Sequence, residues 1–288
     1  LLMALPIVLH TIIFYCAQLF GWAYAFVDYI PGKQIWEQDF VGLLYFERLF
    51  QAGSRLVVAF RNTLIYGVLG IATSVLPVIF AIFLSEVKNT KVKKAIQTMT
   101  SFPNFISWIL VYSLCFMLFS SDGQIIGILV RIGIIDNPTN LLANADIAYI
   151  FQTILTVWKG LGWSAIIYMS TISGIDSELY NAANVDGANR FQRMLHITVP
   201  AVLPTFFVLL VMSVANIANA GFDQYYMFYN PMVSEQLEVI PTYVYRIGIG
   251  SGEISLATAA GITQSLLSVT LLFPVNKLAK KVTGSSVI

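Results

Sequence analysis

The histidines and cysteines of this chain are too scattered to form a catalytic or metal-binding site. His10 and His196 each stand alone, and Cys16 and Cys115 lie in separate apolar stretches without a CxxC spacing. Metal sites and nucleophilic enzymes need such groups in defined patterns, and neither HExxH nor GxSxG occurs in the sequence. We therefore expect no catalytic residue, no metal and no cofactor on this chain, which argues against an intramembrane enzyme.

Polar side chains recur within apolar stretches, where they could line a path through a membrane. At about 100° per residue, those of segments 147–172 and 197–222 each fall on one helical face, and those of segment 254–278 form a looser arc. The three sets are Gln152, Thr156, Lys159, Trp163 and Ser170; Ser213, Asn216, Asn219 and Asp223; and Thr258, Gln264, Ser265 and Ser268.

Two interpretations of these polar faces stay open. Small polar residues also serve helix–helix packing, which we favour for the serines and threonines. An ionisable group at membrane depth indicates function by default, although Lys159 could instead pair with Asp223 or extend to the surface. The candidate residues of a translocation path are Lys159, Trp163, Asn216, Asn219, Asp223 and Gln264.

The composition predicts that membrane-spanning helices position these side chains. Apolar residues make up 57% of the 288 residues and charged residues 11%, against about 25% charged in soluble domains. A span needs about 20 residues, and six segments are long enough. The fold class is therefore an all-α polytopic membrane protein, a single domain over 1–288, with six spans at about 1–26, 62–84, 102–119, 147–172, 197–222 and 254–278. Pro77 should kink the second span unless neighbouring groups compensate for the missing hydrogen bond. Residues 86–94 are expected to form a short basic loop, and a loop of 30 residues is expected to follow the fifth span and reach Ser251. The chain begins inside an apolar run without Met, so we expect further residues before Leu1.

Charge predicts the orientation. If segments 85–101, 173–196 and the C-terminal tail share one side, that side carries nine cations and four acids, and the other side six cations and eleven acids. The positive-inside rule then places the loop 173–196 and the C-terminus in the cytoplasm. The net charge of +1 gives no reason to expect a nucleic acid partner.

The loop 173–196 has the pattern of a short helix, a turn and a second helix. Asp176 is a suitable N-cap with Glu178 in the first turn, and Ala182 and Ala183 keep the helix surface thin. Asp186-Gly187 should end this helix, and Asp186 could cap a second helix at about 188–196. Such an element could dock another protein, or it could be an ordinary loop.

The sequence Asn181-Ala-Ala-Asn-Val-Asp-Gly-Ala188, followed by Phe191 and Pro200, resembles the EAA loop of ABC importer permease subunits. Trp158-Lys-Gly-Leu-Gly-Trp163 and Ala220-Gly-Phe-Asp-Gln224 extend the resemblance to maltose-type carbohydrate permeases, in particular the branch that serves larger oligosaccharides, including uronate-containing ones. The family usually has Glu where this chain has Asn181, so we expect docking by shape rather than by one ion pair. The residues that the resemblance assigns to ATPase coupling are Glu178, Tyr180, Asn181, Ala182, Ala183, Asp186, Gly187, Ala188, Arg190 and Phe191.

The resemblance implies a particular assembly. The chain would form half of an oligosaccharide pathway that works by alternating access in the inner membrane, surrounded by lipid. Its partners would be a second, homologous permease, two ATPase subunits that carry ATP and Mg, and an extracytoplasmic solute-binding protein. The sequence has no GxxxxGK[ST] for binding ATP itself. A secondary transporter or channel is the alternative, but it would need no ATPase-docking loop.

Overall fold

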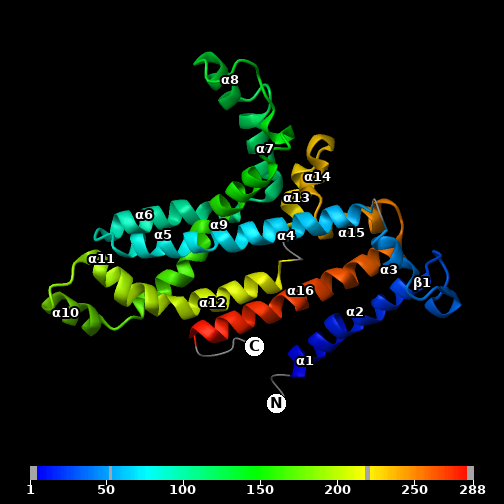
Figure 1. Ribbon diagram of the computed structural model, residues 1–288, viewed down its shortest axis with the longest axis horizontal. Coiled ribbons are helices and arrows are strands. Elements are labelled where there is room, and N and C mark those ends of the chain that lie inside the picture. The colour runs from blue at the N-terminus through cyan, green and yellow to red at the C-terminus, as the bar shows by residue number, and fades with distance from the viewer. Residues whose placement is uncertain (1–4, 52–53, 218–220, 284–288) are drawn as a thin grey trace.

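Long apolar helices make up most of the molecule, and four of them lie along its long axis (Figure 1). The computed structural model describes residues 5–51, 54–217 and 221–283. The four are α4 (Arg55–Thr73), α5 (Val75–Ser85), α12 (Val199–Ala215) and α16 (Ile254–Thr283). A fifth long helix, α9 (Ala148–Ser173), packs against α4, α5 and α12. The predicted helical membrane fold is confirmed.

Within the described residues, five stretches are long and apolar enough to cross a membrane. They are Arg55–Ser85, Trp108–Arg131, Ala148–Ser173, Arg190–Ala215 and Ile254–Lys277. The predicted first span is different, because its apolar helix Leu5–Phe14 is shorter than a full span. There α1 (Leu5–Thr11) passes into a π-turn, then α2 (Ala17–Phe20) and a 3₁₀ segment. A count of six spans therefore stays a prediction.

The second span begins at Arg55 rather than at Asn62, because the Ser54 hydroxyl caps the helix by accepting a hydrogen bond from Leu56 N. The helix is interrupted at Ser74, between α4 and α5. Pro77 lies one turn further on, where its missing N–H and its ring disturb the preceding turn. The structure thus shows an interruption of the span near Pro77, and the kink itself stays a prediction.

The prediction of a basic loop over residues 86–94 is wrong from Thr90 onward. Residues Thr90–Ser101 form helix α6, which packs along α9. The Asn89 side chain caps α6 by accepting hydrogen bonds from Lys91 N and Val92 N. Four lysines suggested a solvated loop, but on this helix Ile96 and Thr100 are half-buried and Ser101 is buried. A 3₁₀ turn, η4 (Phe102–Phe105), then leads to α7, which begins at Trp108 rather than at Phe102.

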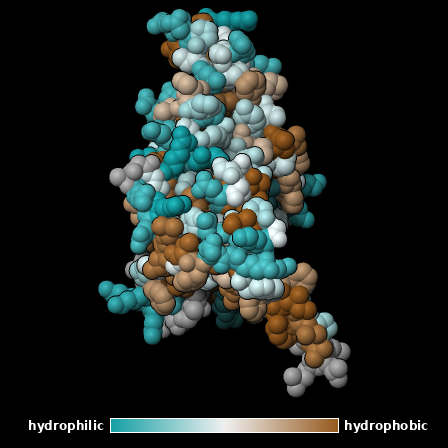
Figure 2. Space-filling model, turned by 90° about the vertical axis from the view of Figure 1, so that its right-hand side faces the viewer, coloured by the Kyte–Doolittle hydropathy of each residue, from teal (hydrophilic) through white to brown (hydrophobic). Residues whose placement is uncertain are grey.

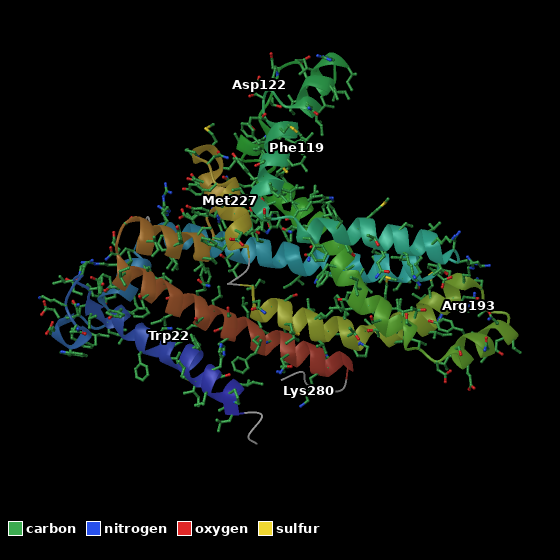
Figure 3. All side chains as sticks on the ribbon, turned by 180° about the vertical axis from the view of Figure 1, so that it is seen from behind. Trp22, Phe119, Asp122, Arg193, Met227 and Lys280 are labelled. Atoms are coloured by element: carbon green, nitrogen blue, oxygen red, sulfur yellow. The ribbon has the colours of Figure 1, made fainter. Side chains whose placement is uncertain are left out.

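Helix α7 (Trp108–Phe119) and α8 (Gln124–Arg131) project away from the long helices as an arm (Figure 1). Figure 3 places Phe119 and Asp122 toward the outer part of this arm and Met227 near its base. Helix α7 packs on α13 (Phe222–Phe228), and the rings of Tyr112 and Phe228 meet edge to face at 5.2 Å. The arm is therefore anchored at its base and exposed along its sides.

The predicted span 197–222 is wrong at its C-terminal end. Helix α12 ends at Ala215 with Asn216 as its C-cap, and α13 begins after Gly221, whose φ is +83°. Asn216 and Asp223 therefore lie on two different helices and not on one face. Asn219 lies outside the described residues.

The segment predicted as a 30-residue loop before 254 is mostly helical. It contains α13, then α14 (Ser234–Leu237), α15 (Ile240–Tyr245) and a π-turn before α16. At the same end of the molecule lie α3 (Leu44–Leu49) and a short antiparallel pair, β1 (Val27–Asp28) and β2 (Asp39–Phe40). Figure 2 looks onto this end, where hydrophilic side chains gather, and α1 extends from it as an apolar protrusion.

Candidate functional site

Helix α10 (Ser177–Val185) lies at the opposite end of the long axis, on the surface of the molecule (Figure 1). None of its nine residues, all described, is buried. The Asp176 side chain caps it by accepting a hydrogen bond from Glu178 N at 2.9 Å, as the sequence predicts. The helix is thus formed by its own capping and by side-chain contacts to the residues that follow it in the chain.

The turn after α10 has the geometry of a Schellman motif. Gly187 has a φ of +76°, Gly187 N donates to Asn184 O, and Ala188 N donates to Ala183 O. Asp186 is therefore the C-cap of α10 and does not cap the next helix, which corrects that prediction. The N-cap of α11 (Arg190–Arg193) is Asn189, which forms a reciprocal capping box with Gln192.

Two side-chain hydrogen bonds tie α10 to the helix that follows it. The hydroxyls of Tyr180 and Thr198 lie 2.9 Å apart, and Thr198 is buried at the start of α12. Arg193 donates to the Asn184 side chain. Tyr180 thus connects a surface helix directly to a membrane-spanning one. Figure 3 shows Arg193 at this extreme end of the molecule.

The outer surface of this element is apolar. Val185 is 88% exposed, Phe191 67% and Leu179 54%. Beside them lies a groove of about 330 Å³. Its lining residues are Ala183, Asp186, Gly187, Ala188, Gln192, Arg193, His196 and Ile197. Apolar side chains on a polar, water-facing end of a protein indicate a contact surface. Val185 and Leu179 were missed as site residues because the motif emphasised the small residues.

A cavity of about 700 Å³ lies between α4, α5, α9 and α12. Of the residues predicted to line a path, Trp163 and Asn216 line it. Lys159, Asp223 and Gln264 are not among its lining residues in the described part of the chain. Asp223 is exposed in the first turn of α13, and Gln264 is half-buried on α16. The structure therefore brings together two of the six candidates.

A glutamine that sequence reasoning overlooked lies at one wall of this cavity. Gln224 is buried, and its amide nitrogen donates to the Gln152 side chain at 2.8 Å and to Gln152 O at 3.0 Å. Thr156 donates to the Gln224 side chain at 3.0 Å. Gln152 and Thr156 were recognised as a polar face of α9. Their partner was hidden because it follows the break between α12 and α13.

Tyr66 adds a second polar group to the cavity wall. Its hydroxyl is buried without a hydrogen-bond partner among the described residues. Its ring packs against those of Tyr225, at 4.4 Å between centroids, and Tyr149, at 5.3 Å. An aromatic wall with amide and hydroxyl groups at its edge suits a ligand that has both apolar and hydroxylated faces.

Lys159 is directed away from this cavity, toward the turn before α7. Its ammonium group donates to three backbone carbonyls, those of Pro103 at 3.1 Å, Asn104 at 2.7 Å and Ile106 at 2.5 Å. The ion pair with Asp223 that the sequence left open is therefore not the contact that Lys159 makes. A lysine ammonium has three donors, and here all three are satisfied by the protein.

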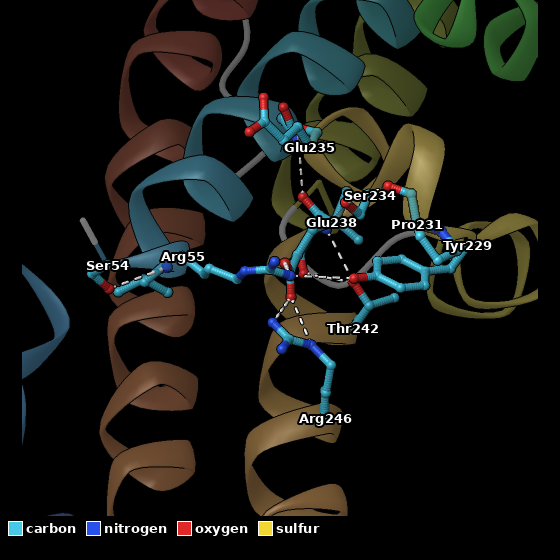
Figure 4. A network of polar contacts seen from close by, with 12 residues as sticks. Ser54, Arg55, Tyr229, Pro231, Ser234, Glu235, Glu238, Thr242 and Arg246 are labelled. Atoms are coloured by element: carbon cyan, nitrogen blue, oxygen red, sulfur yellow. Dashed lines mark hydrogen bonds and ion pairs between the residues drawn. The ribbon is translucent and has the colours of Figure 1, made fainter. Parts of the chain in front are cut away.

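At the end opposite α10, a buried carboxylate joins three segments (Figure 4). Glu238 is 1% exposed, accepts hydrogen bonds from Arg246, and lies 3.5 Å from Arg55 Nη1. Beside it, the fully buried Asn62 donates to the carbonyls of Glu235 and Glu238 and accepts a hydrogen bond from Tyr149. These contacts fix α14 and α15 onto α4 and α9.

Long apolar helices around a central cavity, with an exposed helix–turn–helix at one end, define a membrane transport subunit. Residues 74–284 match the family described as the inner membrane component of binding-protein-dependent transport systems, and the chain belongs to this family. It is thus a multi-pass permease of the inner membrane.

Relatives from Bacillus subtilis (strain 168) match almost the whole chain. Protein LplB is 35% identical over 97% of this chain and 88% of its own length. YteP, a permease of a polygalacturonan/rhamnogalacturonan transport system, is 35% identical over 97% of this chain and 87% of its own length. Among solved structures, a chain of a bacterial alginate ABC transporter, crystallised with its alginate pentasaccharide-bound periplasmic protein, superposes with a TM-score of 0.89 and 31% identity. That match covers 99% of this chain and 94% of the other.

Proposed function

We propose that this permease forms half of the translocation path of an ATP-driven importer for acidic, uronate-containing oligosaccharides. YteP belongs to a polygalacturonan/rhamnogalacturonan transport system, and the structurally similar transporters import the acidic polysaccharide alginate, which supports this substrate class. The proposed assembly contains a second, homologous permease, two ATPase subunits and an extracytoplasmic solute-binding protein. ATP and Mg would bind only to the ATPase subunits.

The exposed helix α10 carries the proposal that this chain is driven by a separate ATPase. Helix α10 has no buried residue and carries apolar side chains on its outer surface. Its Tyr180 hydroxyl is hydrogen-bonded to Thr198 at the start of α12, so the helix is suited to transmit the movement of a bound partner to α12. In this proposal Tyr180, Asn181, Ala182 and Ala183 form the contact surface, with Glu178, Arg190 and Phe191 around it. Asp186, Gly187 and Ala188 hold the turn between the helices.

The central cavity is the proposed half of the path. Trp163 and Asn216 line it, and Gln224 and Tyr66 add polar groups to its wall. Asp223 and Gln264 stay candidates outside the lining, Asn219 stays a candidate that lies outside the described residues, and Lys159 takes a different role. Segments 85–101, 173–196 and the C-terminal tail together carry nine cations and four acids, which supports a cytoplasmic position for α10 and the C-terminus.

Replacing Gly187 with Val tests the coupling role. A β-branched residue at a φ of +76° costs about 1–3 kcal/mol of strain, so the turn should rearrange and the groove should change shape. We expect the Gly187→Val permease to lose its copurifying ATPase while remaining folded. Because ATP is hydrolysed in the cytoplasm, that result would also place α10 on the cytoplasmic side.

Gly133 provides the matched control. It also has a positive φ, +72°, and an added Cβ would meet nothing within 4 Å, but it lies after α8, on the arm. Gly133→Val should retain the ATPase. Equal retention of the ATPase by both variants would refute docking through α10.

A further inference from the structure

Helix α9 and the segment before α7 are joined more closely than ordinary helix packing requires. The three carbonyls that accept from Lys159 belong to the end of η4 and the residue after it. Pro103 O also accepts a hydrogen bond from Ile106 N at 3.2 Å, so Lys159 matters most for the carbonyls of Asn104 and Ile106. The ammonium group also lies 5.5 Å from the centroid of the Trp108 ring, the first residue of α7. Lys159 therefore serves as a charged cap for one turn and as a contact for the next helix.

Two neighbours of Lys159 on the same face of α9 add to this junction. At Gly162, an added Cβ would lie 2.2 Å from the backbone carbon of Thr100, so the end of α6 rests directly on the backbone of α9. The ring of Trp163 meets that of Phe105 in η4 edge to face, at 5.6 Å. Residues 159, 162 and 163 follow the i, i+3, i+4 spacing of one helical face. Together they attach α6, η4 and the base of α7 to α9.

The position of this junction along the chain gives it a consequence for transport. Helix α9 ends at Ser173 and leads within a few residues to α10. A displacement of α10 therefore acts first on α9 and α12. Whether the arm formed by α7 and α8 follows depends on the junction with α9 and on the contact between α7 and α13.

We propose that Lys159 is a positioning residue for transport, whose ammonium group fixes η4 to α9 so that α6, η4 and α7 move with α9 as one unit. This role rests on the proposed function of α10 as the site where ATPase movement enters. It differs from recognition of an anionic substrate, because the donors of Lys159 are directed to backbone carbonyls. In low-dielectric surroundings such charge-assisted bonds are strong, and an apolar side chain would remove this donor from the carbonyls of Asn104 and Ile106.

The first test measures a distance in the complete, unsubstituted transporter. Genetically encoded spin-labelled residues at Leu114 on α7 and Ser170 on α9, both exposed, report the separation of the two helices. We expect the same narrow distance distribution with and without bound ATP. A shift of that distribution between the two states would overturn the proposal, and no variant has to fold for this result.

The second test replaces the ammonium group. We expect Lys159→Met to broaden the distance distribution and to lower sugar transported per ATP hydrolysed about tenfold, the factor that corresponds to losing one charge-assisted hydrogen bond. Lys159→Arg keeps the charge and the donors and should restore the narrow distribution. Lys94→Met removes an exposed cation from α6 and serves as the control. A folded Lys159→Met protein with a wild-type distribution and ratio would refute the role of Lys159.

These results separate this inference from the proposed function. The distance between α7 and α9 in Lys159→Met can be compared with wild type in the permease without its ATPase. A broadened distribution there, together with an ATPase that binds equally well after Gly187→Val, would support the junction and refute docking through α10. An unchanged distribution in Lys159→Met, together with loss of the ATPase after Gly187→Val, would support docking through α10 and refute the junction.

Discussion

Glu238 shows how one buried charge can hold an end of a membrane protein together. Its carboxylate is enclosed, whereas the side chains of its partners Arg55 and Arg246 are 56% and 40% exposed. The desolvation cost therefore falls mainly on the acid, and only the two guanidinium groups compensate for it. This site was not predicted from the sequence, because Glu238 lies in the segment that we expected to be a long loop.

Replacing Glu238 with Gln should destabilise this end of the molecule. Loss of hydrogen bonds to a charged group costs about 2 kcal/mol, and for a chain of this size that lowers the Tm by about 5 °C. Thermal unfolding in detergent measures the change. The control is Glu235→Gln, since the Glu235 side chain is exposed and its contacts to Arg61 and Asn62 use the backbone carbonyl. Equal melting of both variants would contradict the assignment.

Individual site residues could be predicted where a local pattern determines them. Asp176 as N-cap and Gly187 as the turn residue follow from short-range chemistry, and the structure agrees. Lys159 was correctly singled out as unusual, but its partners are some 55 residues away in the chain, and no spacing rule reveals them. Gln224 was missed because its partners, Gln152 and Thr156, are also far away in the chain.

At the scale of elements, apolar length predicted α9 closely and the other long helices approximately. The ends were less predictable, because apolar character continues past the point where a helix stops. Helix α12 ends at Ala215 although Ile217 follows, and α6 was missed because its lysines hid an amphipathic pattern. Caps and close backbone contacts decide such boundaries, and both depend on neighbours that a single sequence does not show.

The contact between α6 and α9 can be tested with two glycines of one helix. Gly162→Ala places a methyl group against the Thr100 backbone, which cannot move aside as a side chain can, so we expect a loss of about 1–3 kcal/mol in stability. Gly160→Ala meets nothing within 4 Å and should be neutral or stabilise by up to about 1 kcal/mol through helix propensity. Thermal unfolding of both variants measures the change in stability. A Gly162→Ala protein as stable as wild type would show that α6 and α9 can move apart without loss of stability.

For the whole molecule, the two ends have different characters and the cavity lies between them. At one end, helix α10 is exposed and can be reached by another protein. At the other end, the ion pairs of the buried Glu238 fix several short helices. This difference fits the proposal that movement enters the permease at α10. The motif predicted the first, but the second became visible only in three dimensions.

Transport itself tests the cavity. We expect Trp163→Ala to reduce sugar uptake about fivefold in liposomes that contain the complete transporter, because stacking on an indole ring contributes about 1 kcal/mol to binding a ring-shaped ligand. Trp158→Ala, on the same helix but not among the lining residues, should transport normally. If both variants transport at the wild-type rate, the cavity is not the path.

The three carbonyls that hold Lys159 also bear on how the chain is made. A lysine in the middle of a span costs about 2.5–3.5 kcal/mol during insertion, and Ala148–Ser173 is the least apolar of the five long stretches. Its acceptors, residues 103, 104 and 106, are synthesised before it and already belong to the neighbouring segment. The carbonyls that bind this ammonium group have therefore already been synthesised when Lys159 enters the membrane. The order of these segments in the sequence can thus lower the cost of inserting the lysine.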